Sequence, residues 1–286
     1  MSKRIYAITH NDLDGIGCAV LLEKVYPQIQ TYAIDYRELN EVLPNILKEA
    51  GKETLVYLTD ISLNEQQAQI CNEFKVQHID HHSSSMKLMS KYDWSFTDPS
   101  HCATYHLYNM LCQYANIQDY KKFVDLVDSY DTWGHGTEPS PEAFDLNRLL
   151  KMIGAETFVA RFKLSSSVNL SKTEKAIVEA DKFQEEQYLN FALSRTQLVK
   201  DAQGRNIGIV AAEQYTSSLG NFILNQVPEL DYVVLLDMLR DKASLRSKGR
   251  VNVGEIAKEC GGGGHPKAAG FQMNEAALKA FWRSNE

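Results

Sequence analysis

The chain has 286 residues, a hydrophobic content of 44% and a net charge of −7. This length favours about two domains. No segment approaches the roughly 18 apolar residues that a membrane span needs, and the N-terminus lacks the apolar stretch of a signal peptide. We therefore expect a cytoplasmic protein with no membrane partner. The negative charge argues against a protein that coats duplex DNA by broad phosphate neutralisation.

The charge and the cysteines narrow the possibilities further. Residues 195–286 carry 12 Lys and Arg against 10 Asp and Glu, whereas the remainder carries 18 against 27. This asymmetry suggests cation binding in the first part and anion binding in the second. The five cysteines are odd in number, widely spaced and without a C-x-x-C pair, which argues against a disulfide framework or a structural zinc site.

The first hundred residues alternate short strand-like runs with amphipathic helical ones. The expected strands cover 5–9, 31–34, 54–59 and 76–79, and the expected helices cover 15–25, 39–50 and 65–74. Alternation of this kind predicts a parallel sheet with helices on both faces. The fold class is therefore α/β.

The next hundred residues or so are predicted to be helical, and the alternation of strands and helices then resumes. Helices are expected over 101–114, 120–129, 142–152, 156–163 and 172–194, with a Gly/Pro-rich loop at 134–141. Further strands are expected over 197–200, 207–212, 232–237 and 243–246, and helices over 218–226 and 253–260. We therefore predict a catalytic metal-binding domain with its connector helix over 1–194, and a smaller α/β substrate-binding domain over 195–286.

Carboxylates and histidines follow three of the expected strands. The segment His10-Asn11-Asp12-Leu13-Asp14-Gly15 follows the first strand, Asp60 follows the third, and Asp80-His81-His82 follows the fourth. Ligands of a parallel α/β sheet bind beyond the carboxyl ends of its strands, so these side chains should share one edge. Each aspartate alone is more simply a helix cap or turn residue. Together they favour a metal centre.

Like charges crowded at one edge raise one another's pKa values, and cations relieve that repulsion. Two divalent cations about 3.5–4 Å apart can share a bridging carboxylate, activate a water and stabilise an in-line displacement at phosphorus. Oxygen and imidazole ligands without cysteine favour two Mn²⁺, with Mg²⁺ or Co²⁺ as alternatives.

A glycine-rich segment in the second domain predicts an anion site. Four successive glycines, Gly261-Gly262-Gly263-Gly264, precede His265, and they let backbone N–H groups approach a phosphate closely. Upstream, Arg246 can grip a phosphate through its planar fork. A flexible glycine loop beside a solvated basic stretch is the plainer alternative. Tyr215 and Trp133, both expected in loops, could stack on bases, although packing is their plainer role.

These motifs together resemble the DHH phosphoesterase superfamily, in particular members with a DHH-associated C-terminal domain. The resemblance covers nearly the whole chain and adds Asp131, which lies in Asp128-Ser129-Tyr130-Asp131-Thr132-Trp133. It implies one cation held by His10, Asp12 and Asp60, and a second held by Asp14, Asp60, His81 and Asp131. It implies a phosphate contact for His82, an orienting role for Asp80, and substrate binding by Arg246, Gly261, Gly262, Gly263, Gly264 and His265, across a cleft between the domains.

The compact build resembles the nanoRNase (oligoribonuclease) and cyclic-dinucleotide phosphodiesterase group of that superfamily. The leading hypothesis is a metal-dependent hydrolase that degrades short single-stranded RNA or DNA, or dinucleotides, to mononucleotides. The alternatives are a 3′-phosphoadenosine phosphate phosphatase, an exopolyphosphatase, a cyclic-dinucleotide phosphodiesterase, and a non-catalytic nucleotide-binding regulator. The sequence leaves open the substrate, the cleavage polarity, the metal and the oligomeric state, a homodimer included.

Overall fold

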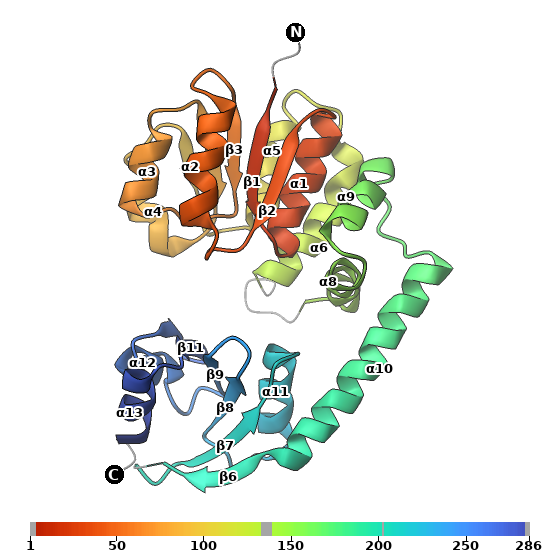
Figure 1. The fold of residues 1–286 in the computed structure, drawn as a ribbon. Coiled ribbons are helices and arrows are strands. Elements are labelled where there is room, and N and C mark those ends of the chain that lie inside the picture. Colours follow the sequence, from red (N-terminus) through yellow and green to blue (C-terminus); the bar gives the residue numbers. More distant parts are fainter. Residues whose placement is uncertain (1–3, 133–138, 202, 284–286) are drawn as a thin grey trace. The chain divides into compact units, whose positions relative to one another are not determined.

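The computed structural model describes residues 4–132, 139–201 and 203–283. The chain divides into two compact units, residues 1–179 and 180–286, and the division falls inside the long helix α10 (Lys172–Arg195) (Figure 1). Trp133 and most of the predicted loop at 134–141 lie outside the described residues. In the part of the chain that the structure describes, no helix combines the length and apolar character that crossing a membrane requires.

The first unit is built on a five-stranded sheet in the order β2-β1-β3-β4-β5, and every pairing in it is parallel. The predicted parallel α/β sheet is therefore confirmed. The chain order reverses between β1 and β3, which places the switch point of the sheet there. The strands are β1 (Tyr6–His10), β2 (Gln30–Ile34), β3 (Val56–Thr59), β4 (Val76–Asp80) and β5 (Ser95–Thr97).

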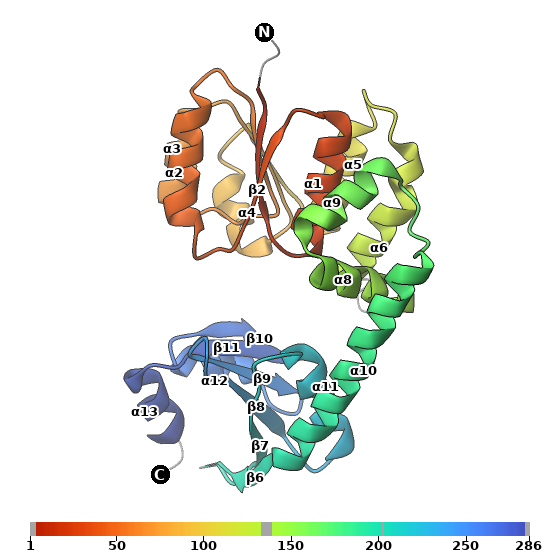
Figure 2. The ribbon, with the colours of Figure 1, turned by 45° about the vertical axis from the view of Figure 1, so that its right-hand side comes forward.

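Helices cover both faces of this sheet (Figures 1 and 2). Successive residues of β1 alternate between two separate cores, because side chains of a strand point to opposite faces. Tyr6 and Ile8 face a core shared with α2 and α3, whereas Ala7 faces a core shared with α1 and α5. The helices that cover the two faces are α1 (Leu13–Val25), α2 (Leu39–Ala50), α3 (Glu65–Cys71), α4 (Ser83–Met89) and α5 (Ala103–Leu111).

A helical subdomain completes the first unit. The aromatic rings of Phe123, Phe158 and Phe162 form its centre, with ring centroids 4.6 Å apart for Phe123 and Phe162 and 4.7 Å apart for Phe158 and Phe162. This core is continuous with the α1 face of the sheet, so the subdomain fixes the end of α6 against the sheet. The subdomain contains the short 3₁₀ helix η1 (Gln118–Tyr120), α6 (Lys121–Asp131), α8 (Pro141–Ile153) and α9 (Ala155–Leu164).

The second unit is a six-stranded mixed sheet in the order β10-β11-β9-β8-β7-β6. Only β7 and β8 pair in parallel, and the other neighbours are antiparallel. One apolar core lies under α12 and another under α11. Its elements are β6 (Gln197–Lys200), β7 (Asn206–Ala211), α11 (Thr216–Gln226), β8 (Tyr232–Asp237), β9 (Lys242–Ser247), α12 (Val253–Glu259), β10 (Gly263–His265), β11 (Ala268–Gln272) and α13 (Glu275–Arg283).

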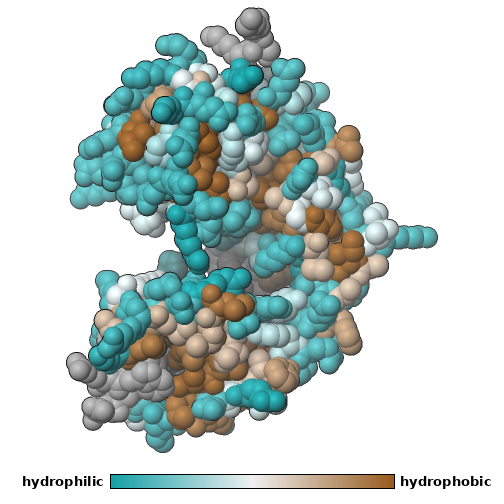
Figure 3. All heavy atoms as spheres, viewed as in Figure 1, coloured by the Kyte–Doolittle hydropathy of each residue, from teal (hydrophilic) through white to brown (hydrophobic). Residues whose placement is uncertain are grey.

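Among the elements of the described residues, α4, β5, η1, β10, β11 and α13 were not predicted. The glycine segment, whose plainer interpretation was a flexible loop, instead enters the edge strand β10 of the antiparallel run β10-β11-β9-β8. On the face shown in Figure 3, hydrophilic residues cover most of the first unit around α2 and α3, as expected for helices that bury only one side.

Candidate metal centre

The predicted site residues lie at the carboxyl ends of β1, β3 and β4, at the switch point of the sheet. His10 is the last residue of β1, Asp60 follows β3 directly, and Asp80 ends β4 just before His81 and His82. Parallel neighbouring strands end at the same edge, so residues far apart in sequence meet there.

The start of α1 brings two more carboxylates to this edge. Asp12 caps the helix by accepting a hydrogen bond from the Gly15 backbone N–H at 3.1 Å. A Cβ atom at Gly15 would lie only 2.0 Å from the His10 carbonyl oxygen, so only glycine allows the helix to begin this close to the strand end. The glycine of the His-Asn-Asp-x-Asp-Gly motif is therefore required by sterics, whereas its histidine and aspartates supply ligand-type atoms.

Asp14 is fully buried and is held by a second helix. Its Oδ1 accepts from the Thr104 N–H at 2.7 Å, and its Oδ2 accepts from the Ala103 N–H at 2.8 Å. Both donors lie in the first turn of α5, where backbone N–H groups have no partner inside the helix and stabilise negative charge. The start of α5 thus fixes the position of this carboxylate.

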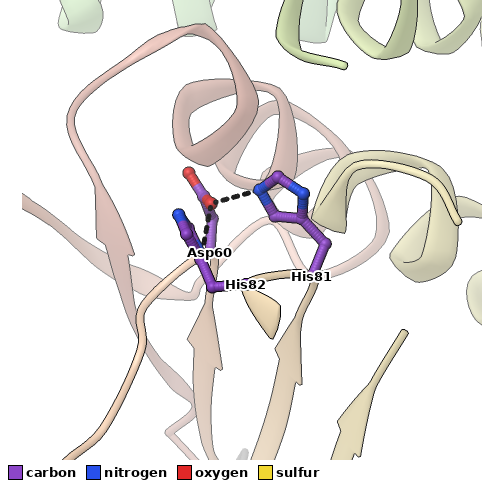
Figure 4. A group of neighbouring side chains, drawn as sticks. All are labelled: Asp60, His81 and His82. Atoms are coloured by element: carbon purple, nitrogen blue, oxygen red, sulfur yellow. Dashed lines mark ion pairs between the residues drawn. The ribbon is translucent and has the colours of Figure 1, made fainter. Parts of the chain in front are cut away.

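The ligand-type atoms form two groups that share Asp60. In the first group, His10 Nδ1 lies 2.8 Å from Asp12 Oδ2 and 3.6 Å from Asp60 Oδ2. In the second group, His81 Nε2 lies 3.3 Å from Asp131 Oδ2 and 3.7 Å from Asp14 Oδ2. It also lies 3.4 Å from Asp60 Oδ1, and Figure 4 shows how Asp60 faces His81 and His82. The two oxygens of Asp60 therefore face different groups.

Asp60 has an unusual backbone conformation that its surroundings maintain. Its φ angle is +56°, in the left-handed region that non-glycine residues rarely occupy. The side chain is only 2% exposed, and the backbone N–H donates to the Ile79 carbonyl oxygen at 2.9 Å. Strain of this kind persists where the fold over-determines a residue, and it concentrates at functional sites.

The electrostatics of the cluster favour a bound cation. Burial raises the pKa of Asp60 well above its usual value, and the charges on Asp14 and Asp12 raise it further. Burial and the charge on Asp14 also raise the pKa of Asp131, to about 7, against the opposing effect of His81. Burial alone would lower the pKa of His10, but its contacts with Asp12 and Asp60 raise it to about 10. Positive charge placed between these groups would remove the repulsion.

Three buried atoms in the described part of the cluster make no hydrogen bond of good geometry, although His10 Nδ1 lies 2.8 Å from Asp12 Oδ2: His10 Nδ1, Asp60 Oδ2 and Asp131 Oδ2. Such atoms are rare in folded proteins and call for a missing partner such as an ion. The three possible metal-binding groups in the described residues all lie here: His10 with Asp12 and Asp60, Asp14 with His81 and Asp131, and Asp60 with His81 and His82. These residues therefore fit divalent cations.

His82 differs from His81 in its contacts. Its Nδ1 lies 2.7 Å from Asp80 Oδ1 and 3.9 Å from Asp60 Oδ1. Asp80 is buried, and its Oδ2 accepts from Ser85 Oγ at 3.0 Å and Ser62 Oγ at 3.3 Å. Burial alone would raise the pKa of Asp80, but the hydrogen bond and charge of His82 lower it to about 2. Asp80 thus occupies Nδ1 of His82, which leaves Nε2 for another partner.

Tyr36 is a neighbour of the site that the sequence did not single out. Its ring centroid lies 5.1 Å from that of His10 and 6.3 Å from that of His82, and its hydroxyl accepts from the Ser62 N–H at 3.0 Å. It stands two residues after β2, so the strand-end argument that found the aspartates applies to it as well. Tyrosine carries no metal-binding signal, which is why it was missed.

In the second unit, Arg246 and His265 share one face of the sheet. Ala268 of β11 pairs with Arg246 of β9 on one side and with His265 of β10 on the other. Directly opposed residues project to the same face, so the small Ala268 lies between the two basic side chains. Arg246 Nη2 donates to Ser217 Oγ of α11 at 3.1 Å. We call Arg246, His265 and Ala268, with Gly263 and Gly270 beside them, the glycine-hairpin face.

The fold requires glycine at some of the four successive positions 261–264 but not at all of them. A Cβ at Gly262 would lie 2.2 Å from the Gly270 carbonyl oxygen, and one at Gly264 would lie 2.5 Å from Ala269 Cα. Gly261 has a φ of +78°, whereas a Cβ at Gly263 would meet nothing within 4 Å. The described fold therefore requires three of the glycines and leaves Gly263 free to serve a ligand.

Two family models match the chain. The DHH family, N-terminal domain, covers residues 4–129, and the DHHA1 domain covers residues 200–284. The protein belongs to the DHH family and carries a DHHA1 domain, which confirms the resemblance stated from the motifs.

Two relatives and one solved structure are similar to the chain. The chain is 28% identical to the protein named oligoribonuclease NrnB of Bacillus subtilis, over 96% of this chain and 74% of the relative. It is 25% identical to a 3′,5′-cyclic-nucleotide phosphodiesterase of Helicobacter pylori, over 95% and 93%. A pGpG-specific phosphodiesterase from Vibrio has the same fold, with a TM-score of 0.59 at 14% identity, over 98% of this chain and 97% of that one.

Proposed function

We propose that this protein is a two-metal phosphodiesterase that degrades short oligonucleotides and dinucleotides to mononucleotides. Its broad class, a hydrolase acting on phosphodiester bonds, follows from its membership of the DHH family. The observation that carries the proposal is the position of Asp60, whose two oxygens face two separate groups of ligand-type atoms.

We assign the residues as the resemblance predicted. His10, Asp12 and Asp60 hold one cation, and Asp14, Asp60, His81 and Asp131 hold the other, with Mn²⁺ as the proposed metal and Mg²⁺ or Co²⁺ as alternatives. The bound cations supply Lewis acidity that activates a water and stabilises the in-line displacement at phosphorus. The surrounding helix ends and strand ends keep the ligand side chains in place before any substrate binds.

His82 contacts the substrate phosphate in this proposal. Asp80 takes its Nδ1 and fixes the orientation of the ring, so Nε2 presents a donor to a phosphate oxygen. Ser85 and Ser62 in turn hold Asp80, and this chain of hydrogen bonds limits the freedom of His82. Asp80 is thus a positioning residue, and His82 is the one that touches substrate.

The glycine-hairpin face binds the phosphate or the terminal nucleotide of the substrate. The Arg246 guanidinium forms charge-assisted hydrogen bonds, and the exposed His265 supplies a further donor. Gly263, Ala268 and Gly270 form a floor without large side chains, which permits close approach of a ligand to the backbone.

The names of the relatives support a small nucleotide substrate. One relative is named for oligoribonucleotides, one for a cyclic nucleotide and one for a linear dinucleotide. Short linear substrates are the leading candidate, because the relative with 28% identity is named an oligoribonuclease. A cyclic-nucleotide phosphodiesterase is the second candidate, on the relative with 25% identity.

Product analysis of labelled RNAs of two to five nucleotides tests the proposal. We expect mononucleotides in the presence of Mn²⁺ and no cleavage after chelation. Parallel reactions with a cyclic dinucleotide, 3′-phosphoadenosine phosphate and polyphosphate rank the alternatives. A higher kcat/KM on polyphosphate than on any nucleotide would overturn the proposed substrate class, and metal-independent cleavage would overturn the two-metal site.

A further inference from the structure

The first unit contains an open hollow of about 600 Å³ next to the metal centre. Its walls come from Tyr36 and the start of α2, from the segment between β3 and α3 with the start of α3, and from α4. None of the predicted metal ligands lines it. The volume lies within the range of sites that bind small organic molecules. We call this hollow the Tyr36 pocket.

The Tyr36 pocket and the metal centre share a wall. Tyr36 lines the pocket, and its ring also packs against His10 and His82. Ser62 and Ser85 line the pocket too, and both donate to Asp80, which holds His82. A molecule bound at the metal centre would therefore have the pocket directly beside it.

The lining of the pocket suits an uncharged, flat and partly polar group. Leu39, Leu63 and Leu88 supply apolar surface, and Tyr36 is 40% exposed. Of the residues that line the pocket, only Glu65 is charged, and its negative sign disfavours a phosphate. The pocket therefore does not suit a second phosphate group or a polyphosphate chain.

A small amide network leaves hydrogen-bond donors at the pocket. Gln67 Nε2 donates to Asn40 Oδ1 at 2.9 Å, and Gln67 and Asn64 bond each other's backbone N–H groups through their side-chain oxygens. This arrangement uses the side-chain oxygens of all three amides. Within residues 4–132, the Nδ2 groups of Asn40 and Asn64 remain available to donate to an acceptor on a ligand.

We propose that the Tyr36 pocket binds a nucleoside of the substrate, with the base stacked against Tyr36 and its acceptor edge towards the amides of Asn40 and Asn64. Aromatic side chains bind bases with little sequence preference, and amide donors add polar contacts. The inference rests on the proposed function, which supplies a phosphodiester next to this pocket. It explains how a nucleotide would be favoured over other phosphate esters at the same metal centre.

A pair of matched variants tests the pocket. Ser84 lines it and Ser90 does not, yet both are exposed and lie in or directly after α4. Ser84→Trp fills the pocket at an exposed position, and Ser90→Trp is the control. We expect Ser84→Trp to lower the ratio of kcat/KM for a dinucleotide over that for bis(p-nitrophenyl) phosphate by about fivefold or more, because base stacking is lost. Ser90→Trp should keep the wild-type ratio.

If Ser84→Trp folds and keeps the wild-type ratio of the two kcat/KM values, the proposed nucleoside binding in the pocket is wrong. If Ser84→Trp does not fold, a comparison of Tyr36→Ala with Tyr36→Phe repeats the test. Only the alanine variant should lower the ratio, because phenylalanine keeps the stacking ring.

Direct binding separates failure of the pocket from failure of the proposed function. Saturation-transfer NMR with adenosine and guanosine needs neither metal nor turnover. We expect a signal with the wild type and Ser90→Trp that weakens with Ser84→Trp. If no dinucleotide is cleaved but this pattern holds, the proposed function fails and the pocket stands. If dinucleotides are cleaved and Ser84→Trp leaves the signal unchanged, the pocket fails alone.

Discussion

The two candidate sites of this protein are assembled in opposite ways. The metal centre collects six side chains from residue 10 to residue 131, and its central carboxylates Asp14 and Asp60 are buried. The glycine-hairpin face comes from neighbouring strands, and its histidine is exposed. The core of the first unit therefore holds the metal centre in place, whereas strand register mainly holds the glycine-hairpin face.

This contrast predicts different kinds of failure on mutation. Changes at the metal centre should remove the chemistry, because buried carboxylates have no substitute. Changes on the glycine-hairpin face should raise KM and lower kcat less than changes at the metal centre do.

The largest effect is expected from Asp60→Asn. Asparagine tolerates the left-handed backbone at this position better than alanine, so the variant should fold while losing a carboxylate that faces both ligand groups. We expect divalent-dependent turnover of a dinucleotide to fall by orders of magnitude, with reduced metal content. Asp93→Asn, at an exposed position of the same unit, is the control. More than a tenth of wild-type kcat in Asp60→Asn would contradict the bridging role.

The next effect is expected from Asp80→Asn. Loss of the carboxylate that orients His82 should lower kcat by about 10- to 100-fold, the range for residues that position a functional group. The metal content, measured by mass spectrometry, should stay at the wild-type value, because Asp80 contacts His82 rather than a cation. Loss of metal in this variant would show that Asp80 belongs to the ligand set instead.

A smaller effect is expected from Arg246→Lys in the second unit. Lysine keeps the charge but loses the planar fork, so KM for a dinucleotide should rise by about tenfold while kcat changes less. Arg250→Lys, at an exposed position in the segment that follows β9, is the matched control. A fall in kcat at constant KM would break the distinction between the two sites.

The smallest effect is expected from Gly263→Ala, and its partner is Gly264→Ala. The first adds a methyl group in open space and should leave the melting temperature unchanged while raising KM a few-fold. The second places a Cβ 2.5 Å from Ala269 Cα at a φ of +140° and should lower the melting temperature. Equal KM values for Gly263→Ala and the wild type would show that no ligand approaches the backbone there.

The parallel sheet and its ligand edge could be predicted because one rule connects them. Once β1, β3 and β4 are recognised as parallel, His10, Asp60 and His81 must end at the same edge. Asp131 lies at the end of α6, and no local pattern separates it from an ordinary helical aspartate. Its place in the cluster depends on the packing of the helical subdomain. Only the resemblance to the family added Asp131 to the predicted ligands.

Three of the elements that escaped prediction, α4, β5 and β10, have weak local signals. The helix α4 begins with Ser83-Ser84-Ser85, a composition typical of loops, and β5 has only three residues. The strand β10 consists of two glycines and a histidine, without the β-branched or aromatic residues that mark strands. Its pairing with β11 defines it, and β11 is in turn placed by its pairing with β9, which lies more than 20 residues earlier in the chain. The Tyr36 pocket was missed for a similar reason, since its walls come from three separate segments.

The central claim is that six side chains hold two cations on either side of Asp60. Crystals grown with Mn²⁺ and measured near the manganese absorption edge test it most directly. We expect two anomalous peaks about 3.5–4 Å apart, both within coordination distance of the Asp60 carboxylate. A single peak, or two peaks of which neither lies near Asp60, would contradict it.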